Sequence, residues 1–187
     1  MNSKLNSLIL TALIALAAGC QSGTANHQQV ERGKYLVAAI GCNDCHTPLT
    51  MTDHGPEPDM SRMLSGHPAS LKMPEPPRMG DGAWQWAGAG TNTAFAGPWG
   101  ISYAFNLTPD TQTGIGIWTE DMFVRALRTG KHMGISRQIL PPMPWQAFRN
   151  MSDEDLKAIY AYLRSIPPVS NHVPDIVEPT ETQAALK

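Results

Sequence analysis

Apolar and polar positions along the chain predict three helices separated by long segments without a sustained period. The first helix is expected over residues 30–40, and Gly41 can close it. Its apolar face consists of Leu36, Val37, Ala39 and Ile40. Gly33 lies inside this stretch, where glycine costs about 1 kcal/mol relative to alanine. A close crossing with another helix would explain the missing side chain.

Two further helices carry both the helical period and recognisable end signals. One is expected over residues 119–129, because Thr119 is a good N-cap, acidic residues follow it, and Gly130 can end the helix. Its apolar face consists of Met122, Phe123, Ala126 and Leu127. The other begins at Ser152 and stops before Pro167. Its apolar positions are Leu156, Ile159, Tyr160, Leu163 and Ile166.

Residues 47–103 show neither a helical nor a strand period. Frequent prolines exclude long regular elements there, whereas Trp84, Trp86 and Trp99 argue against a disordered linker. We therefore expect an ordered but irregular insertion, with short strands near residues 83–87 and 95–99. Residues 130–150 also have the composition of a loop, and the chain beyond Asn171 is expected to lie on the surface or to be mobile.

The start of the chain has the pattern of a bacterial secretion signal. Lys4 supplies a positive charge, and residues 8–18 form an apolar run too short to span a bilayer. The run ends in Leu-Ala-Ala-Gly-Cys, which resembles the lipoprotein box in which the final Cys, here Cys20, is diacylated. An ordinary signal peptide cut near Ala18 is the alternative. The predicted organisation is a lipoprotein signal peptide at 1–19, a flexible tether at 20–29, one domain at 30–170 and a C-terminal tail at 171–187.

Length and charge narrow the class of protein. From Cys20 onward the chain has 168 residues, enough for one domain, and once Lys4 is removed it has 13 Lys and Arg against 16 Asp and Glu. No basic run is present in the sequence, which argues against nucleic-acid binding. The mildly acidic balance says little about which protein docks.

The chemistry is concentrated in residues 42–46, Cys-Asn-Asp-Cys-His, which have the C-x-x-C-H spacing of a haem attachment site. Two thiols at this spacing can each add to one vinyl group of the same porphyrin, and His46 is then held against one face of the iron. The alternatives are a disulfide, or a redox or zinc pair with an incidental His. The sequence has no second C-x-x-C to complete a zinc site. The motif therefore predicts one covalent haem c bound by Cys42, Cys45 and His46.

A sixth iron ligand would close the haem to substrates, and Met143 is the candidate. Pro142 and Pro144 stiffen its loop and leave no N–H group that needs a partner. Because a methionine is usually core filler, alternatives stay open. They are Met133 or Met151, a bis-His centre using His67 or His132, and an open site. Five more methionines lie in the insertion and can line the haem edge: Met51, Met60, Met63, Met73 and Met79.

Together these residues resemble a class I cytochrome c domain. A tighter similarity, to the cytochrome c subunits of periplasmic alcohol, aldehyde and related dehydrogenases, rests on residues 32–37, 46–48, 106–110, 113–116, 118, 143–144, 152–156 and 162–169. The resemblance implies a mainly α fold: a single cytochrome c domain with three to five helices around a covalent haem and a long irregular Pro/Gly-rich insertion. Many such subunits carry two or three haem domains, whereas this sequence has one motif.

The resemblance also implies roles for single residues. Gly33 should cross the last helix near Tyr162, and the carbonyl of Pro48 should accept a hydrogen bond from the ring of His46. Apart from the resemblance, the side chains that can hydrogen-bond a haem propionate are Trp99, Tyr103, Asn106, Arg137 and Trp145. Packing in the haem pocket is the alternative role for each.

Ligation of the iron by His46 and Met143 would leave no position for substrate and would raise the reduction potential. The expected function is therefore that of a mono-haem one-electron carrier, not an enzyme, in a periplasmic, membrane-attached respiratory chain. Its partners would be a dehydrogenase donor and an oxidase or another cytochrome as acceptor, with Cys20 anchoring the protein to a membrane. The alternatives are a haem enzyme or sensor with a displaceable sixth ligand, and a haem-bearing adaptor that only docks a dehydrogenase.

Overall fold

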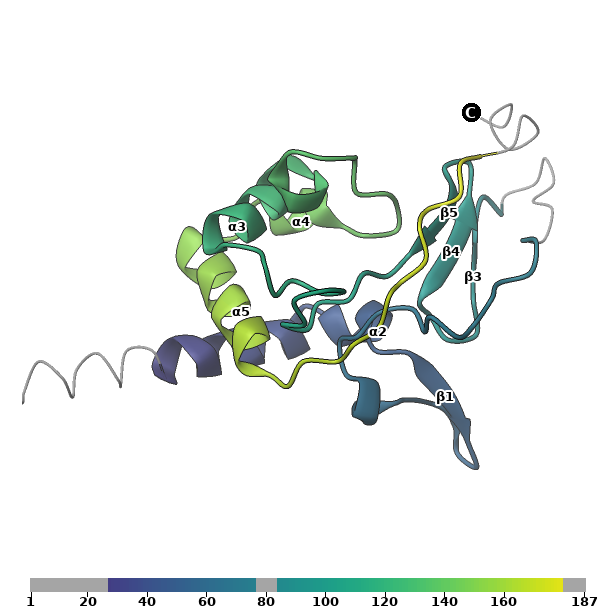
Figure 1. The fold of residues 1–187 in the computed structure, drawn as a ribbon, viewed down its shortest axis with the longest axis horizontal. Helices are drawn as coiled ribbons and strands as arrows, with labels where there is room; N and C mark the ends of the chain where they lie inside the picture. Colours follow the sequence, from purple (N-terminus) through teal and green to yellow (C-terminus); the bar gives the residue numbers. More distant parts are fainter. Residues whose placement is uncertain (1–26, 77–83, 180–187) are drawn as a thin grey trace, which may run out of the picture.

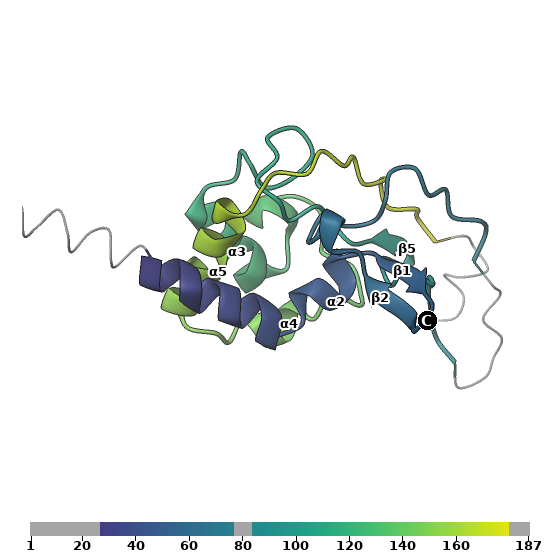
Figure 2. The same ribbon diagram turned by 90° about the horizontal axis from the view of Figure 1, so that it is seen from below.

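The computed structural model describes residues 27–76 and 84–179 (Figures 1 and 2). The predicted signal peptide and Cys20 lie outside these residues. The described chain opens with a helix over residues 27–39, so residues 27–29 are helical and do not belong to the tether predicted at 20–29. The elements that follow are α2 (Cys42–His46), β1 (Leu49–Thr52), β2 (Gly55–Pro58), η1 (Met60–Arg62), β3 (Ala87–Gly88), β4 (Ala94–Gly97), β5 (Gly100–Tyr103), α3 (Glu120–Thr129), η2 (His132–Gly134), α4 (Trp145–Phe148) and α5 (Asp153–Ser165).

The two predicted helices after residue 118 form with their predicted caps. The hydroxyl of Thr119 accepts from the Met122 N–H, and Gly130 ends α3 in the left-handed region with φ 67°. The hydroxyl of Ser152 accepts from the Asp155 N–H at the start of α5. The expected loop at 130–150 is wrong in part, because η2 and the short helix α4 lie within it.

The N-terminal helix crosses α5 (Figure 1). Gly33 lies at this crossing, as predicted. A Cβ at this position would lie 1.9 Å from the Ala158 carbonyl oxygen and 2.8 Å from Tyr162 Cβ. No side chain fits at such a distance, so glycine permits the close approach of the two backbones. A pair between Arg32 Nε and Asp155 Oδ1, 2.9 Å apart, joins the same helices at the surface.

The main hydrophobic core lies among the N-terminal helix, α3 and α5. Leu36 and Val37 contribute to it from the N-terminal helix, and the apolar stripes predicted for the two later helices supply most of the rest. The buried residues of this core are Leu36, Val37, Leu64, Ile115, Trp118, Phe123, Ala126, Leu127, Leu156, Ala158, Ile159, Leu163 and Ile166. Leu64, which comes from the insertion, is fully buried, so the insertion is part of the core.

The insertion is more regular than expected, and the fold is mixed helix and sheet rather than mainly α. β1 and β2 form an antiparallel hairpin that projects from the body of the protein, with Leu49 opposite Pro58 (Figure 1). β3, β4 and β5 form an antiparallel sheet in which Phe95 lies opposite Ser102. The strands expected near 83–87 and 95–99 are therefore present in this sheet with shifted bounds, whereas the β1–β2 hairpin was not predicted.

The described part of the C-terminal tail lies at the surface, as expected, and hydrogen bonds hold residues 169–177 along the body of the protein. Val177 pairs with Ile101 in an antiparallel bridge, with N···O distances of 2.9 and 3.0 Å in the two directions. In Figure 1 this segment runs from the end of α5 to the side of β5. Within 27–76 and 84–179, no helix is long and apolar enough to cross a membrane.

Candidate functional site

A cavity of about 520 Å³ separates α2 from the loop that precedes α4. Cys42, Cys45 and His46 line it from α2, and Met143 lines it from the loop. The structure therefore brings together the four residues that the sequence analysis selected around a haem. We call the α2 side, with its supporting segments 64–67 and 104–107, the His46 wall. We call residues 139–144 the Met143 loop.

The two thiols of α2 are not joined to one another. Burial is the main cause that raises the pKa of the Cys42 thiol to about 12, and burial also raises the pKa of Cys45. Reactive redox cysteines have a lowered pKa in electropositive surroundings, so this environment argues against a redox dithiol. No cluster of three or more His, Cys, Asp or Glu side chains suited to a metal ion occurs among the described residues, which argues against a zinc site.

The ring of His46 is fixed by a distant carbonyl. Its Nδ1 lies 2.7 Å from the Phe105 oxygen, and because a carbonyl only accepts, Nδ1 carries the proton. Burial lowers the pKa of His46, which keeps the imidazole neutral. Nε2 is thus left with a free lone pair in a ring that lines the cavity. The prediction that Pro48 is the acceptor is wrong, because the Pro48 oxygen accepts from the Asp59 N–H (2.9 Å) at the base of the β1–β2 hairpin.

Behind His46, the insertion is hydrogen-bonded directly to α2. The Gly66 N–H donates to the His46 oxygen (2.8 Å), and the Leu64 N–H donates to the Thr47 hydroxyl (2.9 Å). Gly66 has a φ of 78°, and a Cβ there would lie 2.3 Å from the Ala104 oxygen. Only glycine fits this position, both for its backbone conformation and for the space available. The insertion thus builds the support on which the His46 wall rests.

The Met143 loop is held by contacts to β5 and to the end of α3. The Ser102 hydroxyl donates to the Pro141 oxygen (2.6 Å), and the Ile139 N–H donates to the Gly130 oxygen (2.7 Å). The ring of Trp145 packs against Gly130 so closely that a Cβ there would lie 2.3 Å from Trp145 Cε2. These contacts place the half-buried Met143 on the wall of the cavity.

Two of the alternative ligands, His67 and Met133, do not line the cavity. His67 is fully buried outside it, and both ring nitrogens are engaged, Nε2 with the Leu71 oxygen (3.0 Å) and Nδ1 with the Thr93 hydroxyl (2.9 Å). Met133 packs against the main core and does not line the cavity.

Met151 and His132, by contrast, do line the cavity. The His132 ring meets those of Phe105 and Trp118 edge-on at centroid distances of 5.0 and 5.1 Å. Burial, with a contribution from Arg137, lowers the pKa of His132. The insertion methionines lie elsewhere: Met51 and Met60 are exposed, Met63 packs against the core, Met73 lies in a separate groove and Met79 lies outside the described residues.

Of the five residues expected to hydrogen-bond a haem propionate, two line the cavity and three do not. Tyr103 and Arg137 line the cavity. Asn106 is fully buried and binds the backbone and hydroxyl groups of its surroundings, so its predicted role is wrong. Trp99 donates to the Ser102 hydroxyl (3.3 Å), and Trp145 packs on Gly130, so both rings support the Met143 loop instead.

Sequence reasoning missed several residues of the site. Phe105 supplies the acceptor for His46, Trp86 and Ile176 line the cavity, and Ser102 holds the loop. A backbone acceptor leaves no residue-type signal, since any residue has a carbonyl. The isolated Gly66 in the insertion was a signal that a positive φ or a close backbone contact was required there.

The comparisons with known proteins agree with this architecture. The cytochrome c family model matches residues 30–167, and the chain belongs to this family. It is 32% identical over 152 residues, 81% of the chain and 10% of the relative, to a nicotinate dehydrogenase subunit of Pseudomonas putida. It is 29% identical over 169 residues, 87% of the chain and 30% of the relative, to the gluconate 2-dehydrogenase cytochrome c subunit of Pantoea cypripedii. It is 30% identical over 140 residues, 75% of the chain and 22% of the relative, to the fructose dehydrogenase cytochrome subunit of Gluconobacter japonicus.

The chain spans less than a third of the length of each of these relatives. Family membership implies a covalent haem c, and the donor set of the cavity fits one. Two unpaired thiols and a neutral imidazole with a free Nε2 face one largely apolar space, and a thioether faces it from the Met143 loop. These are the donor types of a His/Met haem c site.

Proposed function

We propose that this protein is a mono-haem electron carrier. Cys42 and Cys45 would hold one haem c by thioether bonds, and His46 and Met143 would be the protein ligands of its iron. The observation that carries the proposal is that all four side chains line the same cavity of about 520 Å³. A haem held in this way supplies one-electron chemistry and offers no open iron position to a substrate.

The protein would orient the His46 ring and shield the haem from water. The Phe105 carbonyl fixes the tautomer and the plane of His46 and increases the basicity of Nε2. The apolar walls formed by Phe105, Trp118 and Leu127 keep the surroundings of low polarity, which raises the reduction potential. Tyr103 and Arg137 are the side chains on the wall best suited to meet haem propionates, since both can donate a hydrogen bond.

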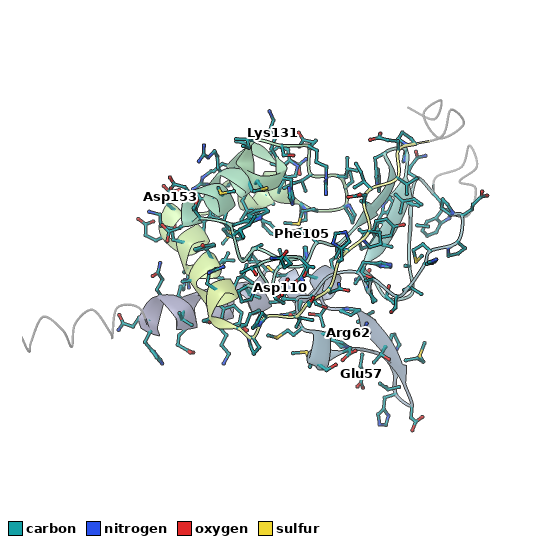
Figure 3. The ribbon with its side chains drawn as sticks, in the orientation of Figure 1. Glu57, Arg62, Phe105, Asp110, Lys131 and Asp153 are labelled. Carbon is teal, nitrogen blue, oxygen red and sulfur yellow. The ribbon has the colours of Figure 1, made fainter. Side chains whose placement is uncertain are left out.

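We infer that redox partners dock beside the Met143 loop. Between Met122 and Ser152 the chain has five Arg and Lys and no Asp or Glu, whereas the whole sequence has 14 against 16. Arg128 pairs with Asp153, and the four other cations of this stretch are exposed, with no ion pair among the described residues: Arg125, Lys131, Arg137 and Arg149. In Figure 3, Lys131 lies at the outer edge while Phe105 lies in the interior. Such a face attracts an acidic partner surface and speeds encounter at low salt.

The donor proposed is a dehydrogenase, and the acceptor an oxidase or another cytochrome. The relatives named above are a subunit of nicotinate dehydrogenase and cytochrome subunits of gluconate and fructose dehydrogenases, which supports a dehydrogenase as donor. We further propose a periplasmic, membrane-anchored location in which Cys20 carries the lipid, based on the sequence pattern alone. Replacing Cys20 with Ala should move the protein from the membrane fraction to the soluble periplasmic fraction.

Purified protein tests the haem and its ligands. A haem stain retained on a denaturing gel, with one iron per chain, is expected for a single covalent haem. Met143→Leu should abolish the sulfur-to-iron charge-transfer band and lower the midpoint potential by on the order of 0.1 V. Met151→Leu, which changes a second methionine of the same cavity, should leave both unchanged. A charge-transfer band that survives Met143→Leu would contradict the assignment of this ligand.

The same variants separate the carrier from a haem enzyme or sensor. A carrier should bind no carbon monoxide in the reduced wild-type protein, whereas Met143→Leu should bind it. Rapid binding by the wild-type protein would favour an open or displaceable sixth position. Reduction of the purified protein by a candidate dehydrogenase with its substrate would argue against a docking adaptor without electron transfer.

A further inference from the structure

Residues 169–177, which we call the strap, follow α5 and cross the protein as an extended chain to the edge of β5 (Figure 1). The strap contributes Ile176 to the wall of the cavity. It has no helix and only one bridge to a strand, so its course depends on a small number of side-chain contacts. Two of its three anchors lie on or next to the segments that support His46, and the third lies on β5.

The strap begins at a pair of buried polar side chains. The Val169 oxygen accepts from Asn106 Nδ2 (2.8 Å), and the Val169 N–H donates to the Thr108 hydroxyl (3.0 Å). Asn106 and Thr108 are both fully buried. Asn106 directly follows Phe105, whose carbonyl holds the His46 ring. The first anchor therefore ties the strap to the residue next to the imidazole acceptor.

Asn171 is the second anchor, and its whole side-chain amide is used. Nδ2 donates to the Ser65 oxygen (2.7 Å) and to the His67 oxygen (2.8 Å), and Oδ1 accepts from the Ala69 N–H (2.9 Å). The two carbonyls that it holds flank Gly66, whose N–H donates to the His46 oxygen (2.8 Å). One side chain of the strap thus fixes the short segment that supports the haem-binding helix from behind.

Val177 is the third anchor and sets the position of Ile176. Its N–H and carbonyl both pair with Ile101, and a Cβ at Gly100 would lie 1.9 Å from the Val177 oxygen. The backbones are therefore in close contact at this point, and glycine at position 100 permits it. Ile176, one residue earlier, is held against the cavity on the β5 side.

We propose that the strap is a working part of the haem site, with Asn171 as a positioning residue for His46 and Ile176 as the closure of one cavity edge. The inference rests on the proposed haem carrier function and adds to it a role for the chain after α5. Release of the strap would remove the clamp on both sides of Gly66 and open the cavity to water and small ligands. Burial from water raises the reduction potential, so release should lower it.

The test uses Asn171→Ala and the isosteric Asn171→Asp in the haem-loaded full chain. Both remove the two N–H donors and leave buried carbonyls without partners, so opening of the strap should become about tenfold more frequent. We expect imidazole to bind the oxidised protein about tenfold faster, since entry requires opening, and the midpoint potential to fall. Amide exchange at Gly66 and Val177 should accelerate together. Asp175→Ala, an exposed change within the strap, is the control and should alter none of these.

Val177→Pro provides an independent test because it removes the N–H that donates to Ile101, fixes φ at this position and leaves the Asn171 contacts in place. It carries the test if the Asn171 variants do not accumulate as folded protein. The strap proposal is overturned if wild-type protein has a covalent, reversibly reducible haem while these variants keep its imidazole binding rate and potential. Failure of the carrier proposal looks different, because the wild-type protein itself would then lack the haem or its one-electron couple.

Discussion

The wall of the cavity that carries His46 is assembled from distant parts of the chain, whereas the Met143 loop is held mainly by neighbours in sequence. Around His46, the Phe105 carbonyl accepts from the ring, and Gly66 donates to the backbone of the same residue. Thr47, which is fully buried, accepts from Leu64 and donates to the Asn43 side chain (2.9 Å). The bond from Leu64 to Thr47 is buried, and those from the His46 ring and to Asn43 are partly buried, so their loss leaves groups with little access to water without a partner.

The Met143 loop has fewer long-range hydrogen bonds than the His46 wall, and its own residues are more exposed. Ser102 is its long-range hydrogen-bond donor, and the contact of Ile139 with Gly130 closes a local turn. Pro141 and Pro144 are exposed and Met143 is half-buried, whereas His46 is 8% exposed. The comparison indicates that the imidazole side is rigid and that the thioether side is the part of the site that can yield. The exposed cations of residues 125–149 are the basis on which we propose that a partner docks on this side.

The largest loss of stability is expected from a substitution at Gly66 in the His46 wall. Gly66→Ala places a Cβ 2.3 Å from the Ala104 oxygen in a residue with φ 78°. Strain and overpacking together should lower the free energy of unfolding by about 3 kcal/mol. Thermal or denaturant unfolding measures this. Gly90→Ala is the matched control, because its Cβ would meet nothing within 4 Å, and a loss of similar size there would contradict the prediction.

Thr47→Val tests the same wall without changing its shape. The hydroxyl that accepts from Leu64 and donates to Asn43 is lost, and the Leu64 N–H stays buried without its partner. We expect a loss of about 2 kcal/mol in the free energy of unfolding. Thr50→Val, on the exposed face of β1, should change stability by far less. Equal effects of the two substitutions would show that the wall does not depend on this hydroxyl.

Ser102→Ala tests the support of the Met143 loop. It removes the hydrogen bond to the Pro141 oxygen, which is partly accessible, so we expect a loss of about 1 kcal/mol in global stability. The local effect should be clearer, because the Met143 loop loses its link to β5 and imidazole should displace the thioether faster. Ser136→Ala, at an exposed position before the loop, is the control. If Thr47→Val accelerated imidazole binding more than Ser102→Ala, the assignment of the rigid and yielding sides would be reversed.

The features that the sequence predicted correctly are those encoded within a few neighbouring residues. The helices at α3 and α5 carry their caps and periods within a few residues, so Thr119, Gly130 and Ser152 were sufficient to place them. The thiols and His46 also act through a local spacing. The four residues selected for a haem line one cavity, although local spacing does not bring Met143 close to His46. A ligand role for Met143 remains a prediction that the variant spectra above test.

The supports of the site were not predictable in this way. The acceptor for His46 is a carbonyl 59 residues away, and the expected acceptor Pro48 is used by the β1–β2 hairpin instead. The strap lacks any periodic pattern because Asn171 and Val177 act singly, each through long-range bonds. Sheet pairing in the insertion is equally non-local, since strand preferences depend on partners that a single sequence does not reveal.

The smallest change in stability is expected at the connection between α4 and α5, and it should depend on pH. Arg128 donates to the carbonyl oxygens of Arg149 and Met151 and to the Asp153 carboxylate, and the bond and charge of Arg128 lower the pKa of Asp153. A carboxyl whose pKa is lowered by folding stabilises the protein above its unfolded pKa, and that contribution is lost as pH falls through the folded pKa.

Asp153→Asn removes this contribution, so its melting temperature should lie below that of wild type at neutral pH, with the difference closing below about pH 4. The gap should stay small and shrink with salt, because the pair is largely exposed. Asp121→Asn changes a carboxylate at the start of α3 that has no ion pair in the described part of the chain, so it measures the helix-dipole contribution alone. If Asp153→Asn melted at the wild-type temperature at every pH, Arg128 would hold the connection through the two carbonyls alone.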